Sequence, residues 1–238
     1  MSVFEIVFSP TGGTRKVSGL VAGALDNNTV TVDLTDSGLD LSAVSMTEDD
    51  VAVISVPAYA GRIPAVVADR LGMVRGNGAR AVLVCVYGNR AFEDTLVELE
   101  DVAKRAGFRV VAAVSAIAEH SVARQFAAGR PDAQDAAQLA EFAQQIQQKL
   151  LAEDASEPSI PGNRPYNKLE VAVWHPRQQR NASPAVHAPR RVPFVLSTRA
   201  TPSEQLTRRA SPACAASPYA REALASLIPT SYPLFPRC

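Results

Sequence analysis

Cysteines and long apolar runs are scarce in this sequence. The 238 residues include three cysteines, Cys85, Cys214 and Cys238. An odd and widely spaced set argues against a disulfide framework, and no two of the cysteines have the spacing of a shared metal site. No run approaches the roughly 20 apolar residues that a membrane-spanning helix needs. The N-terminus also lacks the basic start and long apolar core of a signal peptide. We therefore expect a cytoplasmic protein with no membrane partner and no metal site.

Glycine, aspartate and lysine are absent from the end of the chain. No glycine follows residue 162, and neither aspartate nor lysine follows residue 175. Residues 176–238 carry nine arginines against two glutamates and hold 10 of the 17 prolines, whereas residues 1–175 carry 15 basic and 22 acidic residues. The formal net charge of zero therefore hides an acidic first part and a basic tail. Arginines scattered among prolines, without interleaved aromatic residues, are weak evidence for nucleic-acid binding, and we expect no nucleic-acid partner.

Residues 1–152 alternate short apolar runs with segments of helical period. The runs typical of strands are 3–8, 29–34, 51–56, 81–87 and 109–117, and the helical segments are 14–25, 64–71, 92–106 and 132–152. The runs at 51–56, 81–87 and 109–117 are continuously apolar, as in central strands that are covered on both faces. The alternation predicts an α/β fold, a three-layer doubly wound sheet of five parallel strands. Five strands in this length fit the order 2-1-3-4-5.

The remainder of the chain has no sustained period. We interpret residues 153–175 as a linker with a short extension, in which 166–174 could form a strand that contains the only tryptophan, Trp174. Prolines recur every few residues in 176–238, which we expect to be an irregular or disordered tail. Within that tail only residues 220–228 could form a short helix.

The loop after the first predicted strand has the residues of a phosphate site. Two glycines let the backbone curl so that several N–H groups converge, the hydroxyls add donors, and the following helix adds the positive end of its dipole. No Gly-Lys-Ser/Thr follows, so the loop is not a Walker loop, and its glycine spacing is not that of a dinucleotide fingerprint. The alternative is an ordinary turn between a strand and a helix. We predict that a phosphate is bound by Ser9, Thr11, Gly12, Gly13 and Thr14.

The loop after the third predicted strand contains an aromatic residue, a glycine and an arginine between two prolines, Pro57 and Pro64. Tyr59 could lie against a planar ring, and Gly61 would permit close approach of the backbone. The alternative is a rigid turn from strand to helix.

The loop after the fourth predicted strand offers a similar set of residues. Gly88 and Asn89 have the chemistry of a turn, while Tyr87 and Phe92 offer aromatic faces. Phe92 could instead be the first core residue of the next helix. Because parallel sheets bind ligands at the carboxyl ends of their strands, we predict that the three loops form one site.

These motifs resemble a known family. The pattern Ser-x-Thr-Gly-x-Thr at 9–14 resembles the phosphate loop of flavodoxins, and the stretch 88–92 (Gly-Asn-Arg-Ala-Phe) resembles their Gly-Asp-x-x-Tyr loop. Together with 119–132, residues 1–175 are similar to bacterial flavodoxin–ferredoxin fusion proteins, in which a flavodoxin-like domain precedes a ferredoxin with two 4Fe–4S clusters. The resemblance implies that residues 1–152 form a flavodoxin-like domain that binds FMN. The phosphate would be held by Ser9, Thr11, Gly12, Gly13 and Thr14, and the isoalloxazine ring would be bordered by Tyr59, Gly61, Tyr87, Gly88, Asn89 and Phe92.

This chain has too few cysteines for the ferredoxin part of that family. Two clusters need eight cysteine ligands, and only Cys214 and Cys238 follow residue 176. We therefore expect no iron–sulfur cluster. The resemblance stops abruptly near residue 177, which suggests that the ferredoxin part is lost or that the tail is an out-of-frame translation.

The leading hypothesis is an FMN-binding electron-transfer flavoprotein without catalytic residues, whose partner is a ferredoxin or a reductase. One alternative is a flavin reductase linked to NAD(P)H or a quinone, with Arg62 or His120 contacting the substrate. Another is an interaction module without flavin. The acidic stretch 93–101 could dock a redox partner or could be a solvated helix face.

Overall fold

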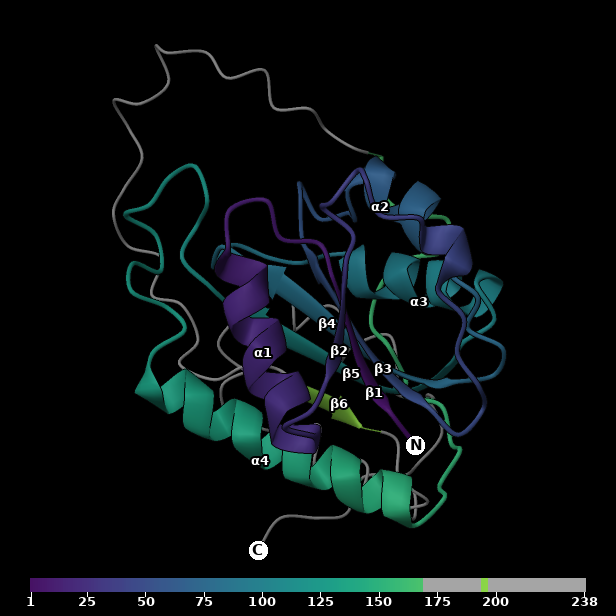
Figure 1. Cartoon of the computed structure of the whole chain (residues 1–238). Helices are drawn as coiled ribbons and strands as arrows, with labels where there is room; N and C mark the ends of the chain where they lie inside the picture. The colour runs from purple at the N-terminus through teal and green to yellow at the C-terminus, as the bar shows by residue number, and fades with distance from the viewer. Residues whose placement is uncertain (169–193, 197–238) are drawn as a thin grey trace, which may run out of the picture. The chain divides into compact units, whose positions relative to one another are not determined.

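The computed structural model describes residues 1–168 and 194–196 (Figure 1). Five parallel strands form most of its sheet: β1 (Val3–Val7), β2 (Val30–Asp33), β3 (Val51–Pro57), β4 (Arg80–Tyr87) and β5 (Arg109–Ile117). They pair in the order β2-β1-β3-β4-β5, and this confirms the predicted order. The three continuously apolar runs form β3, β4 and β5, which are buried on both faces of the sheet. Such burial is expected when helices cover both faces.

Helices cover both faces of this sheet. Those within residues 1–168 are α1 (Gly13–Leu25), α2 (Ala65–Leu71), α3 (Thr95–Arg105) and α4 (Ala133–Leu151), with a short 3-10 helix, η1 (Leu41–Ala43), after β2. Helices α1 and α4 lie on one face and α2 and α3 on the other (Figure 1). Alternate residues of each strand supply the two cores, so that Ile54 packs on the α2–α3 side and its neighbour Val53 on the α1–α4 side. The result is the three-layer flavodoxin-like α/β fold.

Helix α4 begins where its sequence signal predicts. The Asp132 carboxylate accepts hydrogen bonds from the N–H groups of Gln134 (2.9 Å) and Asp135 (3.0 Å). In return, the N–H of Asp132 donates to the carboxylate of Asp135 (2.9 Å). This reciprocal capping box satisfies helix N–H groups that would otherwise lack partners.

A sixth strand, β6 (Phe194–Leu196), extends the sheet. It pairs antiparallel with β5, with Val195 opposite Ala113. These three residues are a regular exception within a tail that is expected to be mostly irregular. Three apolar residues are too few to show an alternating period, whereas the unpaired edge of β5 offers N–H and C=O groups to any neighbouring segment.

The other predictions for the tail lie outside the described residues. They concern 176–193 and 197–238, including the short helix at 220–228, and the strand around Trp174. The described part of that strand, residues 166–168, has no regular secondary structure.

The segment after α4 is irregular but lies against the α2–α3 face. Ile160 packs against the apolar core of that face, and Arg164 forms an ion pair with Asp101 of α3 (2.8 Å). We call residues 157–167 the strap. The stretch interpreted as a linker is thus attached to the domain through residue 167.

The described residues contain no group of three or more His, Cys, Asp or Glu side chains that could hold a metal ion. None of their helices is long and apolar enough to cross a membrane. Cys85 on β4 is fully buried, and burial raises the pKa of its thiol. A buried cysteine with a raised pKa is chemically inert, so Cys85 is part of the core.

Candidate functional site

Four loops adjoin one another at the carboxyl end of the sheet, next to the point where the strand order reverses between β1 and β3. They are residues 8–12, 58–64, 88–94 and 118–132. The N–H of Ala58 donates a hydrogen bond to the carbonyl oxygen of Val86 (2.8 Å), and the N–H of Ala118 donates to that of Tyr87 (3.1 Å). We call this end of the sheet the rim. The structure thus places the three predicted loops along one rim and adds the loop after β5.

The first loop is held in shape by hydrogen bonds from both sides. The N–H of Ser9 donates to the hydroxyl oxygen of Thr35 (2.9 Å), and the hydroxyl oxygen of Ser9 accepts from the N–H of Arg15 (2.9 Å). Gly12 takes a positive φ of 85° immediately before α1, a conformation that favours glycine. The loop therefore turns sharply into the helix.

The N-terminus of α1 keeps free donors. None of the hydrogen bonds found within residues 1–168 uses the backbone N–H of Thr11, Gly13 or Thr14, and Gly12, the N-cap residue, provides no side-chain cap. The first N–H groups of a helix lack partners inside the helix and carry the positive end of its dipole. The N–H groups of Gly13 and Thr14 are two such donors, and together with the free N–H of Thr11, just before the helix, they favour the binding of an anion.

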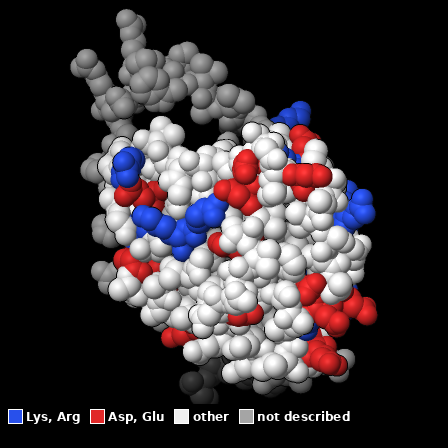
Figure 2. All heavy atoms as spheres, viewed as in Figure 1, with Lys and Arg blue, Asp and Glu red and all other residues white. Residues whose placement is uncertain are grey.

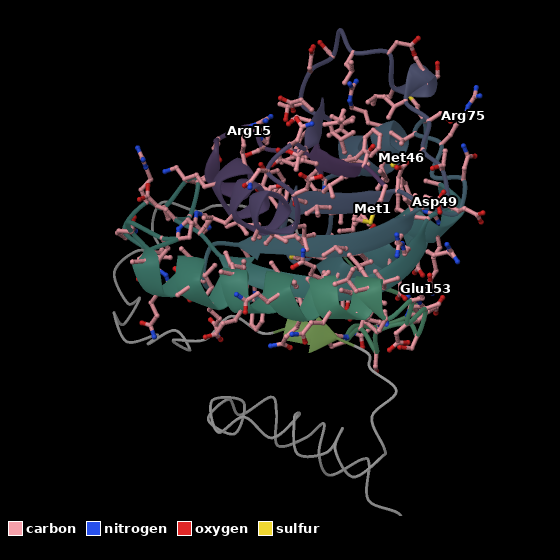
Figure 3. All side chains as sticks on the ribbon, turned by 60° about the horizontal axis from the view of Figure 1, so that its bottom comes forward. Met1, Arg15, Met46, Asp49, Arg75 and Glu153 are labelled. Atoms are coloured by element: carbon pink, nitrogen blue, oxygen red, sulfur yellow. The ribbon has the colours of Figure 1, made fainter. Side chains whose placement is uncertain are left out.

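The arginine beside this loop, Arg15, is already paired. Figure 2 shows basic side chains gathered over the first turns of α1, next to acidic side chains. Arg15 forms an ion pair with Asp33 at the end of β2 (2.5 Å). Figure 3 shows Arg15 at one end of the strands and Asp49 and Glu153 at the other. An anion at this loop would therefore be bound mainly by N–H groups and hydroxyls.

The second loop contains a tight turn. Tyr59 and Arg62 exchange backbone hydrogen bonds (2.9 and 3.1 Å), and the two residues between them, Ala60 and Gly61, have positive φ angles of 52° and 78°. Positive φ at both central positions is typical of a type I′ turn. A Cβ atom on Gly61 would lie 2.1 Å from the carboxylate of Glu93, so glycine is required here by packing within the protein. The Tyr59 side chain remains 41% exposed at the rim.

Arg62 is occupied by contacts within the protein. Its guanidinium donates to both carboxylate oxygens of Glu98 (2.7 and 2.6 Å), and the N–H of Ile63 donates to the same carboxylate (3.0 Å). The hydrogen bond with Glu98 raises the pKa of Arg62. The suggestion that Arg62 contacts a substrate gains no support from this geometry, because two nitrogen atoms of its guanidinium group already bind Glu98 in a bidentate ion pair.

The aromatic residues of the third loop are mostly turned inward. Tyr87 is 7% exposed, and burial raises its pKa to about 12. Its ring meets that of Phe92 edge to face, with centroids 5.5 Å apart. Phe92 in turn packs against the core on the α2–α3 side, as the core alternative for this residue predicted. Of the three aromatic candidates, Tyr59 is the one with a freely exposed face.

Asn89 carries an unused acceptor. Its side-chain oxygen is buried and has no hydrogen-bond partner among the described residues, and its backbone takes a positive φ of 71°. A buried polar atom without a partner costs on the order of 1–3 kcal/mol. A ligand N–H directed at this oxygen would remove that cost.

His120, in the loop after β5, packs against Gly88. A Cβ atom on Gly88 would lie 2.5 Å from Cδ2 of the His120 ring. The Nδ1 atom accepts hydrogen bonds from the N–H groups of Val122 (3.2 Å) and Ala123 (3.0 Å). The ring proton therefore lies on Nε2, and the histidine is an ordered part of the rim.

Sequence reasoning missed three residues that support these loops: Asp94, Glu98 and Tyr166. In the sequence, Asp94 and Glu98 indicate only an acidic helix face, and Tyr166 only part of a possible strand. Their partners in these contacts lie 33 to 104 positions away in the sequence, so no local pattern could indicate the pairing. The acidic face is largely covered by the strap, and Asp101 is paired with Arg164.

No known protein family and no curated protein matches this sequence. Among solved structures, the chain is similar to the flavodoxin of Streptococcus pneumonia TIGR4, with 20% identity over 62% of this chain and 99% of that one (TM-score 0.43). It is also similar to flavodoxin 1 of Bacillus cereus, with 14% identity over 62% of this chain and 98% of that one (0.46). A third similar structure is the apo form of the NADH:FMN oxidoreductase EMOB, with 14% identity over 66% of this chain and 94% of that one (0.46). At these values the similarity describes no more than the fold, which the strand order defines independently.

Proposed function

We propose that residues 1–152 bind FMN at the rim and transfer electrons through it. The observation that carries the proposal is the set of free N–H groups at Thr11, Gly13 and Thr14, at the start of α1. These groups follow β1, next to the switch point of the sheet, where doubly wound folds bind their ligands. A phosphate monoester is the ligand that such a donor set suits.

The phosphate end of FMN fits the chemistry of the first loop. Backbone N–H groups and the Thr11 hydroxyl are donors, and the hydroxyl of Ser9 already orders the loop through the N–H of Arg15. Charge-assisted hydrogen bonds to a phosphate are stronger than neutral ones. Neither a metal ion nor an unpaired arginine is needed.

The ring end of FMN fits the other loops. Tyr59 presents an exposed aromatic face against which a planar ring could stack. Asn89 offers a buried oxygen without a donor, and the isoalloxazine ring carries an N–H group of the kind that this oxygen lacks. When bound, FMN supplies one- or two-electron chemistry, while the chain binds and orients it. No acid–base residue is required for such a carrier.

Titration of the protein with flavin tests the proposal. Protein stripped of ligand should quench the fluorescence of added FMN, and the absorption of bound flavin should be released on denaturation. FMN should bind about tenfold or more tightly than riboflavin, because hydrogen bonds to a charged group contribute about 1.5 kcal/mol or more. Riboflavin is the matched control, since it lacks only the phosphate. Colourless protein that takes up neither flavin would overturn the proposal.

A flavin reductase linked to NAD(P)H or a quinone is the second candidate. The ordered ring of His120 beside Gly88 favours it, because the hydrogen bonds to Nδ1 leave Nε2–H available as a donor. Steady-state oxidation of NADH or NADPH by the FMN-loaded protein, with a quinone as acceptor, would separate this activity from simple electron carriage. Loss of turnover in His120→Ala with unchanged FMN affinity would assign the substrate contact to this residue.

The relation to flavodoxin–ferredoxin fusion proteins is also a proposal. The resemblance of residues 1–175 and the presence of only two cysteines after residue 176 support a lost or frameshifted ferredoxin part, with a separate ferredoxin or reductase as redox partner. Translation of the gene in its other reading frames tests this idea. A cysteine-rich ferredoxin pattern in one of them is expected, and its absence from all frames would contradict a frameshift.

A further inference from the structure

The strap is attached to α3 by a network of charged groups. Arg164 donates to both carboxylate oxygens of Asp101 (2.9 and 2.8 Å) and to Glu100 (2.7 Å). The hydroxyl of Tyr166 donates to Asp101 as well (2.5 Å). Bidentate contacts of arginine with a carboxylate have a defined geometry as well as a defined distance. The strap therefore binds α3 in one defined position.

Asp94 joins the strap to the second loop of the rim. Its carboxylate accepts hydrogen bonds from the backbone N–H and side-chain amide of Asn163 (2.8 and 2.9 Å) and from the N–H of Asn167 (2.7 Å). Its own N–H donates to the carbonyl oxygen of Gly61 (2.9 Å). One residue, fully buried, thus holds the strap with its side chain and the Tyr59–Arg62 turn with its backbone.

Arg62 forms a second connection. Its guanidinium carbon lies 4.5 Å from the centroid of the Tyr166 ring, within the range of a cation–π contact. One of its nitrogen atoms donates to the carbonyl oxygen of Asn167 (3.1 Å), and two others bind Glu98. The strap therefore covers the arginine that follows the exposed Tyr59.

Removal of the strap would take away the donors of the Asp94 carboxylate. Burial tends to raise the pKa of Asp94, but the N–H groups of Asn167 and Asn163 and the charge of Arg62 outweigh burial and lower the pKa. An ionised group that loses such partners has to reach water or take up a proton. Either change would disturb the hydrogen bond from Asp94 to Gly61 at the rim.

We propose that the strap is a positioning element for the candidate FMN site, which sets the conformation of loop 58–64 through Asp94 and Arg62. This role rests on the proposed FMN binding, although the coupling of strap and loop does not depend on it. Tyr166, Asn163 and Asn167 are positioning residues, because they act on the rim through Asp94 and Arg62.

Hydrogen exchange in flavin-free protein tests the coupling. Tyr166→Ala removes the ring beside Arg62, and it should speed exchange of the N–H groups of Arg62 and Ile63 about fivefold or more, the lower range of coupling between sites. Tyr166→Phe keeps the ring and should restore most of the protection. The matched control is Glu157→Ala, which removes a strap contact with Lys104 (2.9 Å) away from Arg62. Unchanged exchange in Tyr166→Ala, or equal acceleration in Glu157→Ala, would overturn the inference.

The site itself is tested with FMN. Tyr166→Ala should weaken FMN binding about fivefold or more and shift the midpoint potential of the bound flavin, whereas Glu157→Ala should change neither. Unchanged affinity and potential in Tyr166→Ala would overturn the positioning role. If the unaltered chain binds no FMN, the proposed function fails, and the hydrogen-exchange result alone then decides whether the strap positions the loop.

Discussion

The backbone N–H of Asp94 donates a hydrogen bond to the carbonyl oxygen of Gly61, and the N and O atoms lie 2.9 Å apart. This bond connects the loop after β4 to the Tyr59–Arg62 turn after β3. Because the Asp94 carboxylate also holds the strap, one residue joins the start of α3, the rim and the segment after α4. The shape of the rim therefore depends on contacts that Asp94 makes within the protein.

Replacement of Asp94 by alanine should destabilise the protein. The substitution leaves the N–H groups of Asn163 and Asn167 without their charged acceptor, and hydrogen bonds to charged groups contribute about 1.5–3 kcal/mol. We expect a loss of this size in the free energy of unfolding, measured by urea denaturation. Asp69→Ala, an exposed position on α2, is the control and should stay within about 0.5 kcal/mol of the unaltered protein. Equal effects in the two variants would contradict the role of Asp94.

Gly12 and Gly19 form a matched pair for testing the first loop. Neither glycine has an atom within 4 Å of the position of an added Cβ, but only Gly12 has a positive φ, at +85°. Gly12→Ala should cost about 1–2 kcal/mol, because L-residues are strained in the left-handed region, and it should weaken FMN binding. Gly19→Ala lies within α1 and should instead stabilise the protein by roughly 0.5–1 kcal/mol. Thermal unfolding and FMN titration measure both effects, and stabilisation by Gly12→Ala would contradict the loop geometry.

The contact between Gly88 and His120 can be tested by a double substitution. An alanine at Gly88 would place its Cβ 2.5 Å from the imidazole ring, and such overpacking costs about 1–3 kcal/mol. In a His120→Gly background the same change should cost less, because the imidazole ring and the Cβ of His120, which would lie 2.9 Å from the added atom, are both removed. The difference between the two costs, measured by urea denaturation, isolates the contact. Simple additivity of the two substitutions would show that the side chains do not meet.

Local signals in the sequence were sufficient for most of the fold. The apolar run predicted at 109–117 is β5 without any shift, and the Pro131-Asp132 start signal lies directly before α4. Both depend on neighbouring residues, whose periods and caps follow from the geometry of strands and helices. The sharp turn of the first loop follows from local residues for the same reason, since its glycines and hydroxyls are contiguous, and phosphate binding there stays a prediction.

Pairings between distant segments were not predictable. Arg164 and Asp101 are 63 positions apart, and the irregular strap has no period that would place it on α3. The inward turn of Phe92 also depends on tertiary packing, because an aromatic residue at the start of a helix can face either the core or a ligand. The support of the rim is thus the part of the site that only the structure reveals.

Acid should weaken the attachment of the strap. The hydrogen bond from Arg164 lowers the pKa of Asp101, and the hydrogen bond from the Tyr166 hydroxyl lowers it further. Burial acts in the opposite direction but is outweighed, so the pKa of Asp101 in the folded state lies below the ordinary 3.8. A carboxylate whose pKa is lower in the folded state than in the unfolded state stabilises the fold fully at pH values above its pKa in the unfolded state. This contribution is lost as the pH falls through its pKa in the folded state. The thermal midpoint of the unaltered protein should therefore exceed that of Asp101→Asn at pH 6, and the gap should close as pH falls below about 3.8. A difference in thermal midpoint that stays constant from pH 6 to pH 2 would contradict an ionised Asp101 where the strap binds α3.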